Sequence, residues 1–472
     1  MSRELQIPSV LSEKESLHTL GLAAICFGFF MVILDTSVVN VALPAMQRDL
    51  HGSLEGLQWV VNGYTLVFAS LLLSAGTLGD RLGHKRTFLM GYVLFTGASF
   101  LCSLAPSLTI LITARVLQGV GPALLVPGSL SLITHGFQDP GKRARAVGVW
   151  VGSSGVGLAG GPVIGGLLVE TLGWRSIFLL NVPFGLLALA LTLCFVNETP
   201  HATELKRDLW GQACVIVVLT TLTYALIEGR SEGWTSFQIV IMFLLCIGAS
   251  GGFLLIEMRH RTPVLPLHFF SSAAFTVPIL VGCLLNFGLY GLLFVLSLFF
   301  QDIHHYPAAL AGAQLLPITV ATGSTALVSG GLTARLGTRL PMIGGLVAGC
   351  IGTLLLLVGE TGNTLLLLVV GEIITGLGCG MTVPAMTTAI LNAVPRSQVG
   401  VASALLNASR QLGGVLGVAI LGSILGSLSE RSAFLAGMHI ALLLVALLFL
   451  LGCAMTATSW VYGESKREEK LQ

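Results

Sequence analysis

Two similar segments decide the fold: Gly76-Thr-Leu-Gly-Asp-Arg-Leu-Gly83 and Gly330-Gly-Leu-Thr-Ala-Arg-Leu-Gly337 lie 254 residues apart. A second pair, Gly119-Val-Gly121 and Gly376-Leu-Gly378, repeats at an offset of 257 residues. A motif that returns at a nearly fixed offset indicates a duplicated structural unit. The sequence therefore predicts two related halves.

The residues around these segments are strongly apolar. Hydrophobic residues make up 54% of the 472-residue chain, charged residues make up 10%, and the mean hydropathy is +0.89. A soluble domain carries about 25% charged residues, and a soluble protein this apolar would expose large hydrophobic patches. The composition therefore predicts an integral membrane protein.

Apolar runs long enough to cross a bilayer recur along the chain. A membrane-spanning helix needs about 20 mostly apolar residues. The predicted fold class is accordingly an all-α membrane protein of fourteen spans, at 20–42, 57–77, 87–105, 107–134, 145–169, 176–197, 209–229, 236–256, 274–299, 309–332, 340–359, 363–391, 399–427 and 435–458.

The repeats and the span count together predict the domain order. We expect an N-terminal segment 1–19, a six-helix bundle 20–197, an inserted helix pair 209–256, a second six-helix bundle 274–458 and a tail 459–472. Parallel repeats of this kind are typical of transporters that bind their substrate between the two halves.

The distribution of Lys and Arg predicts the orientation. With the N-terminus inside, eighteen of these residues lie in inner segments and four lie in outer loops. Because positive charge collects on the cytoplasmic side, both termini are predicted to be cytoplasmic. The first apolar run is too long for a signal peptide and lacks a small-residue cleavage site, so we expect it to remain as a span.

Several other chemistries lack support in the sequence. The nine cysteines are scattered singly along apolar stretches, which favours packing over metal binding. We find no Gly-rich phosphate loop with its Lys-Ser/Thr and no Ser/His/Asp set in a catalytic context. We therefore expect no metal site, no organic cofactor, no enzyme activity and no nucleic-acid partner.

The loop between the second and third spans carries a recognisable pattern of glycines and charges. Glycines allow helix ends to approach closely, and a fixed acid can face the positive N-terminal end of another helix. The basic residues alone would also serve as a positive-inside anchor. The pattern consists of Gly76, Asp80, Arg81, Gly83, Lys85 and Arg86.

The fifth span carries small residues at a spacing of four. Such residues allow two helices to cross closely in lipid, and a proline kinks the helix. The residues are Gly157, Gly161, Pro162, Gly165 and Gly166. Two further segments stand out: Leu34-Asp35-Thr-Ser-Val-Val-Asn40-Val-Ala-Leu-Pro44 in the first span, and the stretch from Leu111 through Arg115 and Gln118 to Pro127 in the fourth.

Together these segments resemble the major facilitator superfamily, and in particular its fourteen-span drug:proton antiporter family. The resemblance covers nearly the whole chain. It implies that the loop 76–86 latches the cytoplasmic side in the outward-facing state, with its partner near Val399–Ala402. Because Ala334 replaces the acid in the second copy, only the first copy should latch. The fifth-span pattern resembles the antiporter signature.

Four charged residues fall within predicted spans: Asp35, Arg115, Glu372 and Arg410. Each would cost about 2.5–3.5 kcal/mol at the bilayer centre, so each should face the interior or a partner. Burial favours the protonated form of a carboxyl group, whereas a nearby cation favours the ionised form. Our hypothesis is that Asp35 is the main proton-binding group and that Arg115 tunes it. The alternative is that Asp35–Arg115 and Glu372–Arg410 are static buried pairs that only orient helices.

Five uncharged polar residues in the spans are candidates to line a central cavity. Asn286 and Tyr290 are four apart and therefore share one helix face. Interhelical hydrogen bonding is an equally good explanation for each of these residues. The full set is Gln58, Asn62, Gln118, Asn286 and Tyr290.

The sequence thus favours a proton-coupled exporter of amphipathic or cationic drugs and dyes, working by alternating access in the cell's inner (plasma) membrane. Its expected partners are small amphipathic molecules, protons and the lipid bilayer, and we expect a monomer. One alternative is a dedicated exporter of a single metabolite, such as an antibiotic or a siderophore. Another is a membrane sensor that does not transport.

Overall fold

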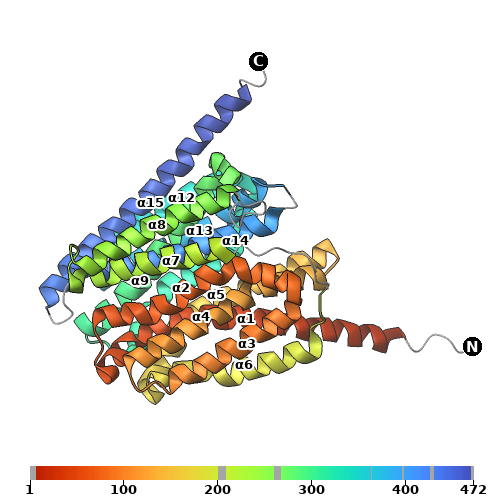
Figure 1. Ribbon diagram of the computed structural model, residues 1–472, viewed down its shortest axis with the longest axis horizontal. Helices are drawn as coiled ribbons and strands as arrows, with labels where there is room; N and C mark the ends of the chain where they lie inside the picture. The colour runs from red at the N-terminus through yellow and green to blue at the C-terminus, as the bar shows by residue number, and fades with distance from the viewer. Residues whose placement is uncertain are drawn as a thin grey trace, which may run out of the picture.

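The computed structural model describes residues 7–199, 209–259, 267–362, 364–395, 398–425 and 430–468, and every regular element in this part of the chain is a helix (Figure 1). Parts of the predicted terminal segments, residues 1–6 and 469–472, lie outside the described residues. The helices are α1 (Ile7–Leu50), α2 (Leu54–Leu82), α3 (His84–Ser103), α4 (Leu108–Gly136), α5 (Pro140–Leu172), α6 (Arg175–Phe195), α7 (Leu209–Glu232), α8 (Phe237–Arg259), η1 (Leu267–Ser271), α9 (Ala273–Leu298), η2 (Phe299–Ile303), α10 (Ala308–Gln314), α11 (Leu316–Leu336), α12 (Arg339–Thr361), α13 (Leu365–Asn392), α14 (Val399–Ile424) and α15 (Arg431–Glu468).

The prediction of an all-helical membrane fold is confirmed. Each predicted span coincides with a helix, except that the tenth is divided into α10 and α11, which meet at a bend of 41°. Eleven helices are long and apolar enough to cross a membrane, or up to 13 if each of two bent pairs is one span. α3 is outside this count because its first turn is the polar stretch His84-Lys-Arg-Thr87.

The helices pack as two groups, with α1–α6 in one half and α9–α15 in the other. In the first half, α1 packs on α5 and α6, and α4 packs on α2 and α3. In the second half, α13 packs on α11 and α12, and α9 packs on α14. Side-chain caps begin several helices: Ser53 accepts a hydrogen bond from Gly56 N, and Asp139 accepts one from Lys142 N. Such caps satisfy backbone donors that the helix leaves unpaired.

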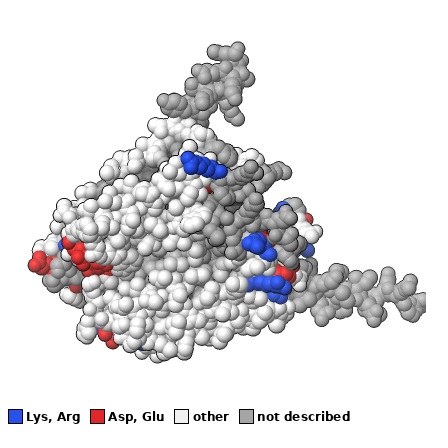
Figure 2. Space-filling view, in the orientation of Figure 1, with Lys and Arg blue, Asp and Glu red and all other residues white. Residues whose placement is uncertain are grey.

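The start of α1 and the end of α15 lie toward one end of the bundle, which we call the terminal face (Figure 1). The visible Lys and Arg side chains gather mainly toward this end, and Asp and Glu gather mainly at the other end, the opposite face (Figure 2). This distribution agrees in sign with the charge bias used to predict the orientation.

The two halves are joined near the opposite face. Gln58 Nε2 on α2 donates to Val418 O at 2.8 Å and to Ala419 O at 2.9 Å on α14. Ser297 Oγ on α9 donates to Asn40 O of α1 at 2.7 Å, and Gln301 Nε2 donates to Val41 O at 3.0 Å. These bonds close the seam between the halves at that end.

Several glycines toward the terminal face have open space beside them. A Cβ atom built on Gly76, Gly330, Gly331 or Gly400 would meet nothing within 4 Å. In the same direction, the axes of the two helix groups diverge (Figure 1). The hydrogen bonds across the seam thus lie toward the opposite face, and the helix axes diverge toward the terminal face (Figure 1).

The inserted helix α7 contacts both halves. Trp59 Nε1 of α2 donates to Glu228 Oε1 of α7 at 2.8 Å. Near the other end of α7, Gln212 bonds to Ser70 O and to the Ser74 hydroxyl, on either side of a 57° bend in α2. Arg230 Nη1 donates to Ser423 O of α14 at 3.2 Å. α7 thus lies along α2 and reaches α14.

Candidate functional site

Asp35 on α1 lies at the centre of a buried polar cluster in the first half. Arg115 Nη1 of α4 donates to Asp35 Oδ2 at 2.6 Å. Gln118 Nε2 donates to Asp35 Oδ1 at 3.0 Å, and Asn181 Nδ2 of α6 donates to the same oxygen at 2.9 Å. Asp35 and Arg115 are each 1% exposed. Three N–H donors thus converge on a carboxyl group that is removed from solvent.

The Arg115 guanidinium is held on several sides. Its Nε donates to Val60 O at 3.0 Å, and its Nη1 also donates to Gln118 Oε1 at 2.7 Å. The guanidinium carbon lies 4.1 Å from the centre of the Tyr64 ring, within range of a cation–π interaction. The Asp35–Arg115 pair that was considered from the sequence is present in the structure.

A small space lies between the halves beside this cluster. Its volume is about 10 Å³, enough for about one water molecule. Asp35 does not line it; the next residue on α1 does. The lining residues are Thr36, Asn40, Val61 and Thr65 from the first half and Tyr290, Gln411, Gly414 and Val418 from the second. Asp35 instead faces α4 and α6, inside its own half.

The other two intramembrane charges, Glu372 and Arg410, do not form an ion pair with each other in the described structure. Arg410 Nε on α14 donates to Asn286 Oδ1 of α9 at 3.4 Å, and no carboxylate among the described residues pairs with Arg410. Glu372 on α13 is 1% exposed, and its Oε2 has no hydrogen-bond partner in the described structure. The alternative of a static Glu372–Arg410 pair therefore does not fit this geometry.

The five polar cavity candidates occupy different environments. Tyr290 lines the central space, and Asn286 lies one turn away, bonded to Arg410. Gln58 closes the seam, and Gln118 belongs to the Asp35 cluster. Asn62 is 0% exposed, and neither of its amide atoms has a partner in the described structure.

Sequence reasoning missed several members of the site. Asn181 and Ser99 complete the Asp35 cluster, since Gln118 Nε2 donates to Ser99 Oγ at 2.7 Å. Both are polar residues within apolar spans, which is the signal that could have found them. Asn40, another missed residue, lines the central space, and its Oδ1 has no partner in the described structure.

The glycine-rich loop between α2 and α3 is bonded within its own half. Asp80 Oδ1 lies 3.2 Å from His84 Nε2, one turn further along the chain. Glu198, just after α6, accepts from Lys85 N at 3.1 Å and lies 3.6 Å from Arg86 Nε. Arg81 is exposed, and Gly83 adopts a φ of 91°. The loop is thus not latched onto Val399–Ala402, as expected where the halves are separated at this face.

Replacing Glu198 with Ala is expected to destabilise the start of α3 by about 0.5–2 kcal/mol. α3 has no side-chain cap of its own, and the Glu198 carboxylate meets its positive N-terminal end. Thermal unfolding of the purified protein measures the change. Glu232→Ala, which removes an exposed acid at the end of α7, is the matched control. Equal melting temperatures for the two variants would contradict the capping role.

The small residues of α5 pack closely on two other helices. Cβ atoms built on Gly157 and Gly161 would lie 2.9 Å from Phe30 O and 1.8 Å from Ser37 Oγ of α1. A Cβ on Gly166 would lie 2.4 Å from Ala308 O of α10, in the other half. Gly165 packs on Val38, and Pro162 O lies against Gly312. The pattern thus packs α5 on α1 and across the seam on α10.

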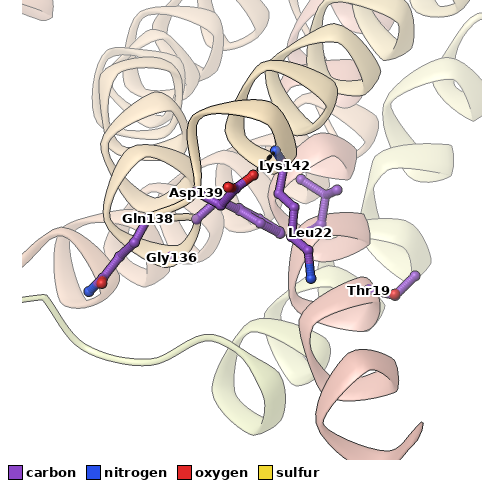
Figure 3. A pocket seen from close by; sticks show the side chains of 7 residues that line it. Thr19, Leu22, Gly136, Gln138, Asp139 and Lys142 are labelled. Carbon is purple, nitrogen blue, oxygen red and sulfur yellow. Dashed lines mark hydrogen bonds between the residues drawn. The ribbon is translucent and has the colours of Figure 1, made fainter. Parts of the chain in front are cut away.

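A larger pocket lies away from the seam, at the terminal face (Figure 3). Its volume is about 310 Å³, and it lies between the start of α1 and the turn from α4 to α5. Thr19, Leu22, Phe137 and Lys142 are among its lining residues. None of the predicted site residues lines it, so it does not define the transport site.

The sequence model of the Major Facilitator Superfamily matches residues 25–327 and 318–469 of the chain. Together with two helical halves and a seam between them, this match shows that the chain belongs to the major facilitator superfamily. The superfamily consists of transporters, so the protein is a membrane transporter.

Curated relatives cover most of the chain. The chain is 38% identical to the Multidrug resistance protein Stp of Mycobacterium tuberculosis, over 86% of this chain and 76% of the relative. It is 39% identical to the Methylenomycin A resistance protein of Bacillus subtilis, over 88% of this chain and 90% of the relative. It is 35% identical to the Tetracenomycin C resistance and export protein of Streptomyces glaucescens, over 86% and 76%.

Solved structures share the fold at low sequence identity. A bacterial homologue of the human lysosomal transporter Spinster, in an inward-facing and unoccupied conformation, aligns with a TM-score of 0.69 and 17% identity, covering 94% of this chain and 97% of that one. A peptide transporter POT in complex with sulfate aligns with a TM-score of 0.68 and 16% identity, covering 93% and 95%.

Proposed function

We propose that this protein exports small amphipathic molecules across the cytoplasmic membrane in exchange for protons. The observation that carries the proposal is the fully buried Asp35–Arg115 pair beside the seam of a two-half transporter. The names of the relatives, which refer to drug and antibiotic resistance and export, support the class of cargo. Buried acids in membrane spans are costly, and their default role is functional.

Asp35 is placed to link proton binding to movement of α1. A proton on the Asp35 carboxyl group would remove its charge attraction for Arg115 and weaken the bond between α1 and α4. Thr36 and Asn40, on the same helix, line the central space. Ser37 Oγ donates to Gly157 O at 3.2 Å and ties α1 to α5, which contacts α10 across the seam. A shift of α1 would therefore reach the seam directly.

Glu372 is the second candidate proton site. A buried carboxyl group without a cation beside it is stable in its neutral, protonated form. The two buried acids therefore differ in environment: Asp35 has an arginine partner, whereas Glu372 Oε2 has no partner in the described structure.

Transport by inside-out membrane vesicles tests the proposed function. We expect a fluorescent amphipathic dye to accumulate in vesicles that contain the protein when the interior is acidified, and to leak out when an ionophore collapses the pH gradient. ATP added without a gradient should have no effect. Dye accumulation that is unchanged by the ionophore would contradict proton coupling.

The breadth of the cargo separates a multidrug exporter from a dedicated exporter. The latter has specific support because relatives are named for single antibiotics, methylenomycin A and tetracenomycin C. Resistance of an expressing strain to several unrelated compounds supports broad export, and resistance to one compound supports a dedicated pump. A sensor that does not transport would confer neither.

A further inference from the structure

Within the part of the chain that the structure describes, the central space between the halves lacks the acidic side chains that a transporter of cations would use to bind its cargo. No acidic side chain among the described residues lines the central space. The negative charge of Asp35 is compensated by Arg115 and faces away from the seam. A cationic cargo would therefore find polar side chains here but no carboxylate partner.

Arg410 brings an uncompensated positive charge to the same seam. It lies midway along α14, and its half-buried side chain packs on α9, where its Cγ would lie 3.2 Å from a Cβ built on Gly282. Its Nε bonds to the neutral amide of Asn286, which leaves its charge unpaired within the described structure. A cation within a membrane span needs a counter-charge or strong acceptors.

Arg410 adjoins the central space along α14. The next residue, Gln411, lines the central space, as does Tyr290, which lies one turn from Asn286. α14 begins at the terminal face, so Arg410 lies on that side of the space, where the two halves diverge. Across the seam, Asn40 is 2% exposed and its Oδ1 has no partner in the described structure.

We propose that Arg410, Asn286 and Tyr290 form a subsite for an anionic oxygen group of the cargo, such as a carboxylate or phenolate, with Asn40 binding a donor group of the same molecule. This inference rests on the proposed transport function and narrows its cargo to anionic amphipathic compounds in place of cationic dyes. Arginine binds such oxygen groups by charge-assisted hydrogen bonds. The side chains of Val61 and Val418 offer an apolar surface for the rest of the molecule.

Binding to the purified full-length protein in lipid nanodiscs tests the subsite without requiring transport. The probes share one fluorescent ring system: 9-anthracenecarboxylate is anionic, its methyl ester is neutral and 9-(aminomethyl)anthracene is cationic. We expect the carboxylate to bind about tenfold or more tightly than the amine, after subtraction of binding to empty nanodiscs.

Three variants separate charge from structure. Arg410→Gln should remove the preference for the carboxylate over the ester, and Arg410→Lys should retain much of it. Asn286→Asp should also remove the preference, because it supplies a counter-charge at the atom that Arg410 already contacts. Tighter binding of the amine, no carboxylate binding to the wild type, or an equal loss for all three probes in Arg410→Gln would overturn the proposal.

Different experimental results would contradict the proposed transport function. If the carboxylate preference is present in nanodiscs but no anthracene probe accumulates in vesicles under a pH gradient, proton-driven export is contradicted and the anion subsite stands. If the probes accumulate equally whatever their charge and Arg410→Gln changes nothing, export stands and the subsite is refuted.

Discussion

Replacing Asp35 with Asn is expected to reduce proton-driven transport to the level of vesicles without the protein. The substitution removes the carboxyl group that we propose binds the proton and leaves the Arg115 guanidinium buried without a counter-charge. Breaking one side of a buried ion pair costs about 3–5 kcal/mol. We therefore expect a lower melting temperature as well as the loss of transport.

The double variant Asp35→Asn/Arg115→Gln distinguishes a coupling role from a structural one. Removing both charges avoids an isolated buried cation, so most of the stability should return. Proton-driven transport should not return, because the double variant still lacks the titratable group. Recovery of transport together with stability would show that the pair only orients helices, which was the alternative considered from the sequence.

Replacing Gly312 with Ala is expected to force the seam apart at the opposite face. A Cβ atom at this position would lie 2.0 Å from Pro162 O, a backbone atom of α5 that cannot rotate away. Overpacking of this kind costs about 1–3 kcal/mol, and the cost applies only to the conformation in which α5 and α10 touch. The population should therefore shift toward a state open at the opposite face.

Hydrogen exchange read by mass spectrometry measures this shift. Backbone amides of α10 and the adjoining end of α5 should exchange faster in Gly312→Ala, and those at the terminal face should exchange more slowly. Gly330→Ala is the matched control, because its added Cβ would meet nothing within 4 Å while the gain in helix propensity is the same. Identical exchange in the two variants would refute the seam contact.

The architecture was accessible from the sequence because it depends on long periodic patterns. Apolar run length located the helices, and the two repeated segments defined the halves. Their position within apolar runs marked Asp35 and Arg115 as intramembrane charges that need a partner, and the structure pairs them at 2.6 Å. Counting apolar residues is less decisive for α3. Its polar first turn leaves it too little apolar length to be counted among the helices that can cross a membrane.

The rotation of each helix about its axis was not accessible in the same way. Gln118 is a polar residue in a span, as is Tyr290, but Gln118 turns into the first half and Tyr290 turns to the seam. A static Glu372–Arg410 pair was one alternative from the sequence, yet Arg410 contacts Asn286. These outcomes depend on which neighbouring helix each face meets, and a single sequence does not contain that information.

The two edges of the seam differ because α7 covers only one of them. On that edge α7 bonds to α2 near both of its own ends and to α14 near the opposite face. On the other edge α5 meets α10 and α11 directly, and a Cβ on Gly155 would lie 3.6 Å from Gly323 Cα. A hydrophobic compound dissolved in the surrounding leaflet thus meets a shielded flank on one side and a glycine-lined flank on the other. The inserted pair thus makes the two lipid-facing flanks of the seam different, which two equivalent halves alone would not do.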